Sequence, residues 1–200
     1  MPSGKNKTGL FFGSFNPIHT GHMIIAEYFT QFADLNELWF VVTPHNPLKE
    51  KKSLLDDPFR YEMAEIAIKN NSKFCICDAE FRLPKPSYTV HTLAYLKEKH
   101  PAKSFVLIMG SDNLTTIDKW KNYNILLNEY QIYVYPRANF PIDKIPELFR
   151  KHPNVKIFEA PIIEISSSFI RDAIKKGKKL KYFIPEAIYI YINEKGFYLK

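Results

Sequence analysis

The chain has 200 residues, of which 46% are hydrophobic and 24% charged, with a formal net charge of +7. This length and composition suit a folded domain with its own core and exclude a low-complexity or collagen-like chain. The N-terminal residues contain no apolar signal region and no run approaches membrane-spanning length, so we expect a cytoplasmic protein without a membrane partner. We predict one domain over residues 1–200, with residues 176–200 as a C-terminal helical region.

Strands and helices are predicted to alternate along the chain. The predicted strands cover residues 8–12, 37–43, 73–77, 105–109, 131–135 and 155–158. The predicted helices cover residues 21–33, 59–70, 90–99, 142–150, 169–176 and 185–194. This alternation indicates an α/β fold with a doubly wound, mostly parallel, Rossmann-like sheet and helices on both faces. Ligands bind such sheets beyond the carboxyl ends of the strands, near the point where the strand order reverses.

Two histidines follow the first predicted strand. His19 and His22 close the run Gly-Ser-Phe-Asn-Pro-Ile-His-Thr-Gly-His over residues 13–22. Histidines three apart lie on one helix face, and the unpaired amides of a helix start suit an anion. A lone pair of this kind is often surface decoration, but its place after the first strand predicts a polyphosphate site.

A second candidate motif is Ile-Ser-Ser-Ser-Phe-Ile-Arg over residues 165–171. Serines at a helix start are good caps, and capping alone would explain them. Arg171, one turn into the helix, adds a guanidinium near the N-terminal amides, which favours an anion at the same place.

The remaining charged and sulfur-containing residues carry weaker signals. Lysines gather at residues 49–52 and 175–181, where a solvated surface is the simpler interpretation. The positive charge favours nucleotides and raises nucleic acid as a partner, but the aromatics form no stacking platform, so we predict no nucleic-acid binding. Cys75 and Cys77 lack a second pair for zinc and are predicted to be free thiols in a reducing compartment.

In their order and separation, the two motifs resemble the nucleotidyltransferase superfamily that carries His-x-Gly-His early and Ile-Ser-Ser-x-x-Ile-Arg late. Within it, the chain is similar over nearly its whole length to the bacterial nicotinate-nucleotide adenylyltransferases. The further matching segments are Pro-Ser-Tyr-Thr-Val-His-Thr-Leu at residues 86–93, Gly-Ser-Asp-Asn-Leu at residues 110–114 with Trp120, Ile-Pro at residues 184–185 running to Tyr191-Ile192, and Lys-Gly-Phe-Tyr at residues 195–198.

The resemblance implies adenylyl transfer from ATP to nicotinate mononucleotide, with release of pyrophosphate. It implies that His19 and His22 hold the ATP phosphates, that Arg171 and Ser167 grip the leaving β- and γ-phosphates, and that Lys49 adds positive charge. Lys49 is equally well a solvated lysine. Mg²⁺ is expected through the ATP phosphates, without a ligand set from the protein.

The resemblance also assigns ligand-binding residues outside the two histidines. Those for ATP follow the first and fourth strands or open the late helix: Gly13, Ser14, Phe15, Asn16, Gly110, Asp112, Ile165, Ser166 and Ser167. Tyr88 and Thr89 would approach the nicotinate ring with backbone N–H groups, and Trp120 would stack on it. Trp120 as a packing anchor and Asp112 as a helix N-cap are the structural alternatives; Arg137 ranks low as a phosphate ligand.

One departure from the family concerns the choice between acid and amide. Many bacterial members carry Asp where this chain has Asn16, and Asn also occurs in relatives that accept nicotinamide mononucleotide. The Ser-Tyr-Thr segment favours the acid. Pantetheine-phosphate adenylyltransferase activity and a catalytically inactive nucleotide-binding module remain as alternatives, and a homo-oligomer is left open.

Overall fold

The computed structural model describes residues 6–44 and 54–199. Its centre is a six-stranded sheet in the order β3-β2-β1-β4-β5-β6, in which every neighbouring pair is parallel. The strands are β1 (Asn6–Gly13), β2 (Glu37–Val42), β3 (Phe74–Cys77), β4 (Lys103–Gly110), β5 (Gln131–Tyr135) and β6 (Val155–Ile157). The doubly wound parallel sheet predicted from the alternation is confirmed, and its strand order reverses between β1 and β4.

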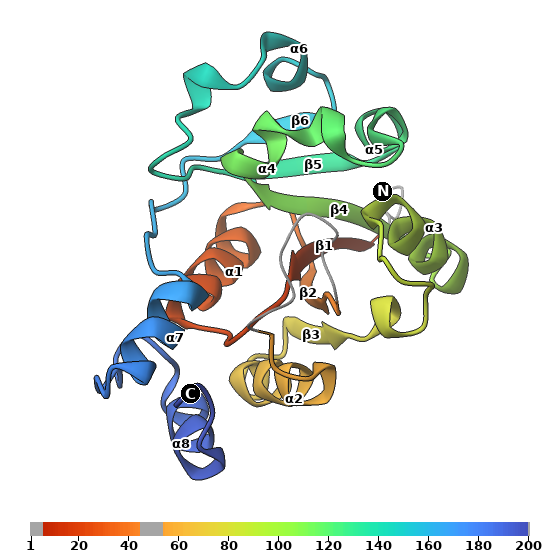
Figure 1. Ribbon diagram of the computed structural model, residues 1–200. Helices are drawn as coiled ribbons and strands as arrows, with labels where there is room; N and C mark the ends of the chain where they lie inside the picture. The colour runs from red at the N-terminus through yellow and green to blue at the C-terminus, as the bar shows by residue number, and fades with distance from the viewer. Residues whose placement is uncertain (1–5, 45–53, 200) are drawn as a thin grey trace.

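Helices cover both faces of the sheet, and Figure 1 shows α1 and α3 on opposite sides. The α-helices are α1 (Thr20–Phe32), α2 (Asp57–Ile68), α3 (Thr89–Lys99), α4 (Ser111–Thr115), α5 (Tyr123–Glu129), α6 (Glu147–Arg150), α7 (Ser167–Lys175) and α8 (Glu186–Lys195). Short 3₁₀ turns lie at η1 (Ala79–Phe81), η2 (Ile117–Lys119) and η3 (Ile142–Lys144).

Each central strand supplies side chains to both cores because successive residues point to opposite faces. Phe11 and Phe40 pack with Phe29 of α1 on one face. Leu10 packs with Leu93 of α3 on the other face. Because these strands are buried on both faces, their residues are apolar at successive positions, which explains the continuous apolar runs in the sequence.

The structure differs from the predicted elements in two places. The single helix expected at residues 142–150 is two short pieces, η3 and α6, because Pro146 is the N-cap of α6 and interrupts the ladder. The segment between β4 and β5, for which no helix was predicted, holds α4, η2 and α5. Each has at most seven residues, too few for a helical period to be visible in the sequence.

The C-terminal region packs against the first half of the chain. Helix α8 contacts α2, and the Tyr191 hydroxyl donates to Glu62. The hydroxyl of Tyr198 donates to Asn16 Oδ1 at 2.9 Å, and the N–H of Thr20 donates to the carbonyl of Phe183 at 3.0 Å. This region therefore supports the turn that follows β1.

Both cysteines are free thiols, as predicted. Burial raises the pKa of the Cys77 thiol to about 11.

Among the helices of residues 6–44 and 54–199, none combines the length and apolar character that crossing a bilayer requires.

Candidate active site

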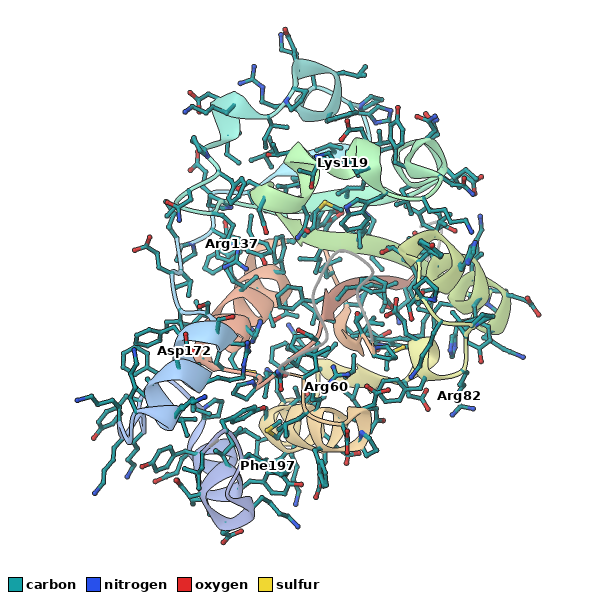
Figure 2. The ribbon with its side chains drawn as sticks, in the orientation of Figure 1. Arg60, Arg82, Lys119, Arg137, Asp172 and Phe197 are labelled. Atoms are coloured by element: carbon teal, nitrogen blue, oxygen red, sulfur yellow. The ribbon has the colours of Figure 1, made fainter. Side chains whose placement is uncertain are left out.

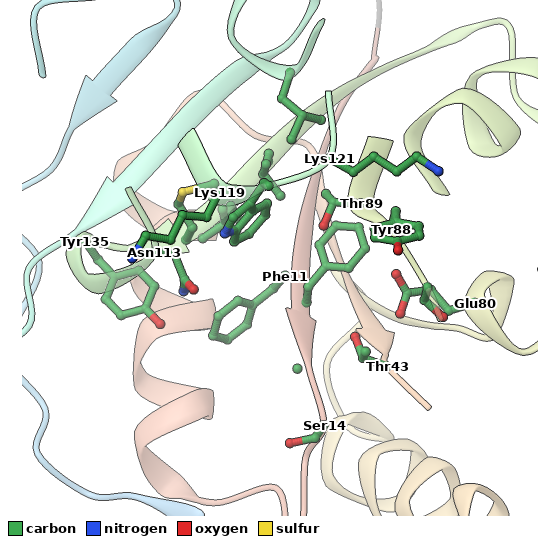
Figure 3. Close-up of a pocket in the computed structure, with 18 residues that line it drawn as sticks. Phe11, Ser14, Thr43, Glu80, Tyr88, Thr89, Asn113, Lys119, Lys121 and Tyr135 are labelled. Atoms are coloured by element: carbon green, nitrogen blue, oxygen red, sulfur yellow. The ribbon is translucent and has the colours of Figure 1, made fainter. Parts of the chain in front are cut away.

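A cavity of about 350 Å³ opens at the carboxyl ends of β1 and β4, the place predicted from the strand order (Figure 3). Its size is in the range of small-ligand pockets. Residues from β1, β4, the end of β5 and the segments that follow β1, β2, β3 and β4 line it: Phe11, Phe12, Gly13, Ser14, Thr43, Glu80, Ser87, Tyr88, Thr89, Leu107, Ile108, Met109, Asn113, Lys119, Trp120, Lys121, Leu126 and Tyr135.

The two motif histidines lie together at the start of α1. His19 is the N-cap and His22 the third helical residue, and their rings stack with centroids 3.7 Å apart. Nδ1 of His22 accepts the N–H of His19 at 3.2 Å, so the proton of a neutral His22 ring lies on Nε2. Gly21 is needed here, because a Cβ would come within 2.8 Å of Ile163 and 3.1 Å of the His19 ring.

His19 is held as a neutral imidazole. Burial, and then the positive charge of Arg137, lower its pKa to about 3. Its Nδ1 is buried and has no hydrogen-bond partner within the described residues. A neutral ring with an unpaired nitrogen keeps hydrogen-bonding capacity for a ligand without bringing a charge of its own.

The amides at the start of α1 are less available than predicted. The N–H of Thr20 donates to Phe183 O, and that of His22 donates to His19 O at 2.9 Å. The expected ring of free amides is therefore wrong at these two positions. The C-terminal segment and a tight first turn satisfy those groups, which leaves side chains as the main donors.

The late motif meets the early one across more than 145 residues. Ser166 is the N-cap of α7 and accepts the N–H of Phe169 at 3.2 Å, so its predicted capping role is confirmed. Ser167 Oγ donates to Pro17 O at 2.9 Å, and Arg171 Nη1 donates to Asn16 O at 2.8 Å. The serine hydroxyl and the guanidinium thus contact the same turn that leads to His19.

The turn between β1 and α1 needs its glycine and a strained residue. A Cβ on Gly13 would lie 2.6 Å from the ring of Phe15, and Phe15 itself has a φ of 45°, in the left-handed region. Phe15 is 1% exposed and packs in the core rather than facing the cavity. The side chain of Ile165 packs against the same core. In the predicted ATP site, Phe15 and Ile165 would therefore offer backbone groups to the ligand and not their side chains.

Asn16 is buried in the turn that follows β1. The side chain is fully buried, and Oδ1 accepts the Leu55 N–H at 3.2 Å and the Tyr198 hydroxyl. It does not line the cavity that holds Tyr88 and Trp120. Its contacts are those of a residue that anchors the turn.

A buried arginine that the sequence interpretation missed holds the same turn. Arg60 of α2 is 0% exposed and donates from Nη1 to Ser14 O at 2.6 Å and to Thr43 O at 2.8 Å. Nε donates to Leu55 O at 2.9 Å and Nη2 to Pro44 O at 3.1 Å. Figure 2 shows Arg60 where α2 faces the end of β1. Its only sequence signal is an arginine in a first helical turn.

Gly110 is the last residue of β4, and Asp112 follows the strand, at the strand end where both were expected. A Cβ on Gly110 would lie 2.3 Å from Asp112 Oδ1, so this close approach requires glycine. The N-cap of α4 is Gly110, so the alternative of Asp112 as a cap is wrong. Asp112 Oδ1 forms an ion pair with Arg137 Nε at 3.8 Å, too far for a hydrogen bond, and among the described residues this buried atom has no hydrogen-bond partner.

Arg137, which we ranked low as a phosphate ligand, lies close to Asp112 and His19. It lies between Asp112 and His19, over the Tyr135 ring at 5.3 Å, and its position is visible near α1 in Figure 2. The isolated bridge between Arg137 and Phe140 fixes its backbone. A single arginine after a strand has no distinguishing sequence pattern. Only the fold shows that Arg137 lies near His19 and Asp112.

The predicted ring-binding residues line the cavity together. Tyr88 is the N-cap of α3 and Thr89 is its first residue. Both line the same cavity as Trp120, and Figure 3 shows Tyr88 and Thr89 side by side there. Trp120 also packs against the core beneath it, so both of its predicted roles fit. Lys49, predicted to add charge, lies outside the described residues.

The comparisons with known proteins agree with this arrangement. A family model of cytidylyltransferase-like proteins matches residues 10–173. A probable nicotinate-nucleotide adenylyltransferase of Flavobacterium johnsoniae is 50% identical over 97% of this chain and 100% of its own length. Another, of Bacteroides fragilis, is 46% identical over 92% and 90%.

Solved structures give the same result. The nicotinic acid mononucleotide adenylyltransferase of Plasmodium falciparum, complexed with NaAD, superposes with a TM-score of 0.80 at 25% identity. The match covers 96% of this chain and 97% of that one.

Proposed function

This chain belongs to the cytidylyltransferase-like family and, within it, to the nicotinate-nucleotide adenylyltransferases, and we propose from that premise how its residues carry out the reaction. The enzyme transfers the adenylyl group of ATP to nicotinate mononucleotide. An oxygen of the mononucleotide phosphate bonds to the α-phosphorus, the bond from that phosphorus to the bridging oxygen breaks, and pyrophosphate leaves. The products are the dinucleotide and pyrophosphate, as NAD biosynthesis requires.

The reaction needs positioning and charge neutralisation more than proton transfer. The attacking phosphate is already an anion at neutral pH, so no general base is required. His19 and His22 donate to the triphosphate at the start of α1 and stabilise the charge that develops in the transition state. Since His19 is neutral, the positive charge there comes from Arg171 and Arg137.

The observation that carries this proposal is the meeting of the two phosphate motifs. Arg171 and Ser167 bond to the carbonyls of Asn16 and Pro17, which directly precede the His19 turn. A guanidinium can clamp the leaving phosphates from that position. The cavity lined by Gly13 and Ser14 begins beside the same turn, so a mononucleotide held there is next to the triphosphate.

The other end of the cavity suits a pyridine ring. The indole of Trp120 offers a stacking face, and the segment of Tyr88 and Thr89 offers backbone donors at the start of α3. A carboxylate accepts hydrogen bonds only, which matches backbone N–H groups, whereas a carboxamide also presents an NH₂. We therefore propose a preference for the acid, set at this end of the cavity, which Asn16 does not line.

A divalent cation, Mg²⁺, is proposed to bind through the ATP phosphates. Within the described residues, no group of three or more His, Cys, Asp or Glu side chains could hold a metal, and Asp112 faces Arg137. The donor set therefore fits a cation carried by the triphosphate rather than by the protein. When bound, it neutralises phosphate charge.

Measuring pyrophosphate release tests the function. The purified protein is incubated with ATP and, in parallel, with nicotinate mononucleotide, nicotinamide mononucleotide and phosphopantetheine. We expect fastest release with nicotinate mononucleotide. Faster release with phosphopantetheine would identify the other adenylyltransferase, and no release with any acceptor would identify a nucleotide-binding module without catalysis.

A further inference from the structure

Several polar atoms around the cavity are buried and unpaired. Within the described residues, Glu80 Oε2, Ser87 Oγ and Trp120 Nε1 have no hydrogen-bond partner, and all three residues line the same cavity. Buried polar atoms without partners are rare in folded proteins and costly. Their convergence on one cavity indicates a polar ligand group bound at this end.

Glu80 is the unexpected member of this set. It lies in η1, after β3, and is 2% exposed. One carboxyl oxygen, Oε1, accepts the hydroxyl of Thr92 at 3.0 Å. Figure 3 shows the carboxyl group beside Tyr88 and Thr43, on the cavity side of η1. An acidic residue is thus part of a pocket that is expected to receive a carboxylate.

The surroundings of Glu80 shift its titration toward the neutral form. Burial raises the pKa of this carboxyl, while the hydrogen bond from Thr92 opposes the rise. Of the titratable and charged groups in the described part of the chain, Cys77 at the end of β3 interacts electrostatically with Glu80, and Tyr88, Lys119 and Lys121 line the same cavity. Both lysines are exposed, and the Nζ of Lys121 lies over the Tyr88 ring at 4.5 Å.

We infer that Glu80 is a specificity-determining residue, whose neutral carboxyl donates a hydrogen bond from Oε2 to the carboxylate on the pyridine ring. This inference rests on the proposed function. The bond is charge-assisted with the acid and neutral with the amide, so it strengthens binding of nicotinate mononucleotide more. An ionised Glu80 would do the opposite, because two carboxylates repel each other.

Two substitutions of Glu80 test whether a hydrogen-bond donor at this position sets the preference for the acid. Glu80→Gln keeps an N–H donor of nearly the same shape, so we expect the ratio of kcat/KM for acid over amide to stay within about threefold. Glu80→Met removes the donor and keeps the bulk, so the same ratio should fall about tenfold with KM for ATP unchanged. Glu65→Met serves as the control, because it makes the same substitution at an exposed glutamate of α2 that does not line the cavity, and it should leave the ratio unchanged.

An infrared difference spectrum gives a readout that does not depend on the Met variant folding. Adding nicotinate mononucleotide to the wild type should shift the carbonyl band of a protonated carboxyl, and the Glu80→Gln variant should lack that band. A tenfold rise of the acid preference in Glu80→Gln, or a spectrum without a protonated carboxyl, would overturn the inference. An unchanged ratio in Glu80→Met would overturn it too. Failure of the proposed function is distinct, because the wild type would then form no dinucleotide from nicotinate mononucleotide.

Discussion

Replacing Arg60 by Met should destabilise the protein strongly, because this fully buried guanidinium ties together separate parts of the site. It donates to the carbonyls of Ser14, Thr43, Pro44 and Leu55 and pairs with Asp57. Removing it leaves four carbonyls without this donor. Each bond contributes about 1 kcal/mol net, and breaking a buried charged network costs about 3–5 kcal/mol in total.

We therefore expect the free energy of unfolding to fall by about 4 kcal/mol, measured by urea denaturation. With a slope of about 2 kcal/mol per molar urea, the midpoint falls by about 2 M. Tyr198→Phe is the matched control, because it removes one bond to Asn16 Oδ1, which keeps the Leu55 N–H. Its cost should be about 1 kcal/mol.

The folded fraction of the Arg60→Met variant should also lose kcat/KM, since Ser14 borders the cavity. A cost of stability no larger than that of Tyr198→Phe would refute the reasoning. It would mean that water or neighbouring donors satisfy the four carbonyls without the arginine.

Four further results are expected. His19→Ala and His22→Ala should each lower kcat about 100-fold or more while leaving mononucleotide binding nearly intact, and near-normal kcat would contradict their catalytic role. Arg171→Lys should raise KM for ATP more than KM for the mononucleotide, because a bidentate fork becomes a point charge; equal effects in steady-state kinetics would point to a folding defect. Trp120→Ala should raise KM for the acid and the amide by similar factors, because stacking does not distinguish them, and a changed ratio would argue against stacking. Because the pKa of His19 is about 3 when folded and near 6.5 when unfolded, the unfolded state takes up the extra proton, and the stability of the unliganded protein should fall as pH drops from about 6.5 toward 3. His19→Asn should show a shallower fall in denaturation midpoint over that range, and an equally steep fall would refute the buried neutral state.

The strands and the place of the site could be read from the sequence because both have strong local signals. The apolar runs of β1, β2 and β4 are buried on two sides, and the motif that contains His19 follows β1 directly. Parallel strands bring such segments to one edge, so the pairing of early and late motifs could be expected. The short helices α4 and α5 lacked that signal.

The residues that depend on long-range packing could not be predicted. Arg60, Glu80 and Arg137 stand singly in the sequence, and their significance comes from what the fold places around them. The hydrogen bond from the Thr20 N–H to the Phe183 carbonyl likewise joins segments that are distant in the sequence. For Asn16 the sequence indicated a place within the phosphate motif, and the fold adds its contacts with the Leu55 N–H and the Tyr198 hydroxyl, which come from distant segments.

The central claim is that the α-phosphorus of ATP is transferred to the mononucleotide phosphate. The most direct measurement follows the label from ATP carrying ³²P at the α or the γ position, in the presence of nicotinate mononucleotide. Label from the α position should appear in the dinucleotide, and label from the γ position should appear only in pyrophosphate. Transfer of the γ label to the mononucleotide, or its release as inorganic phosphate, would contradict adenylyl transfer.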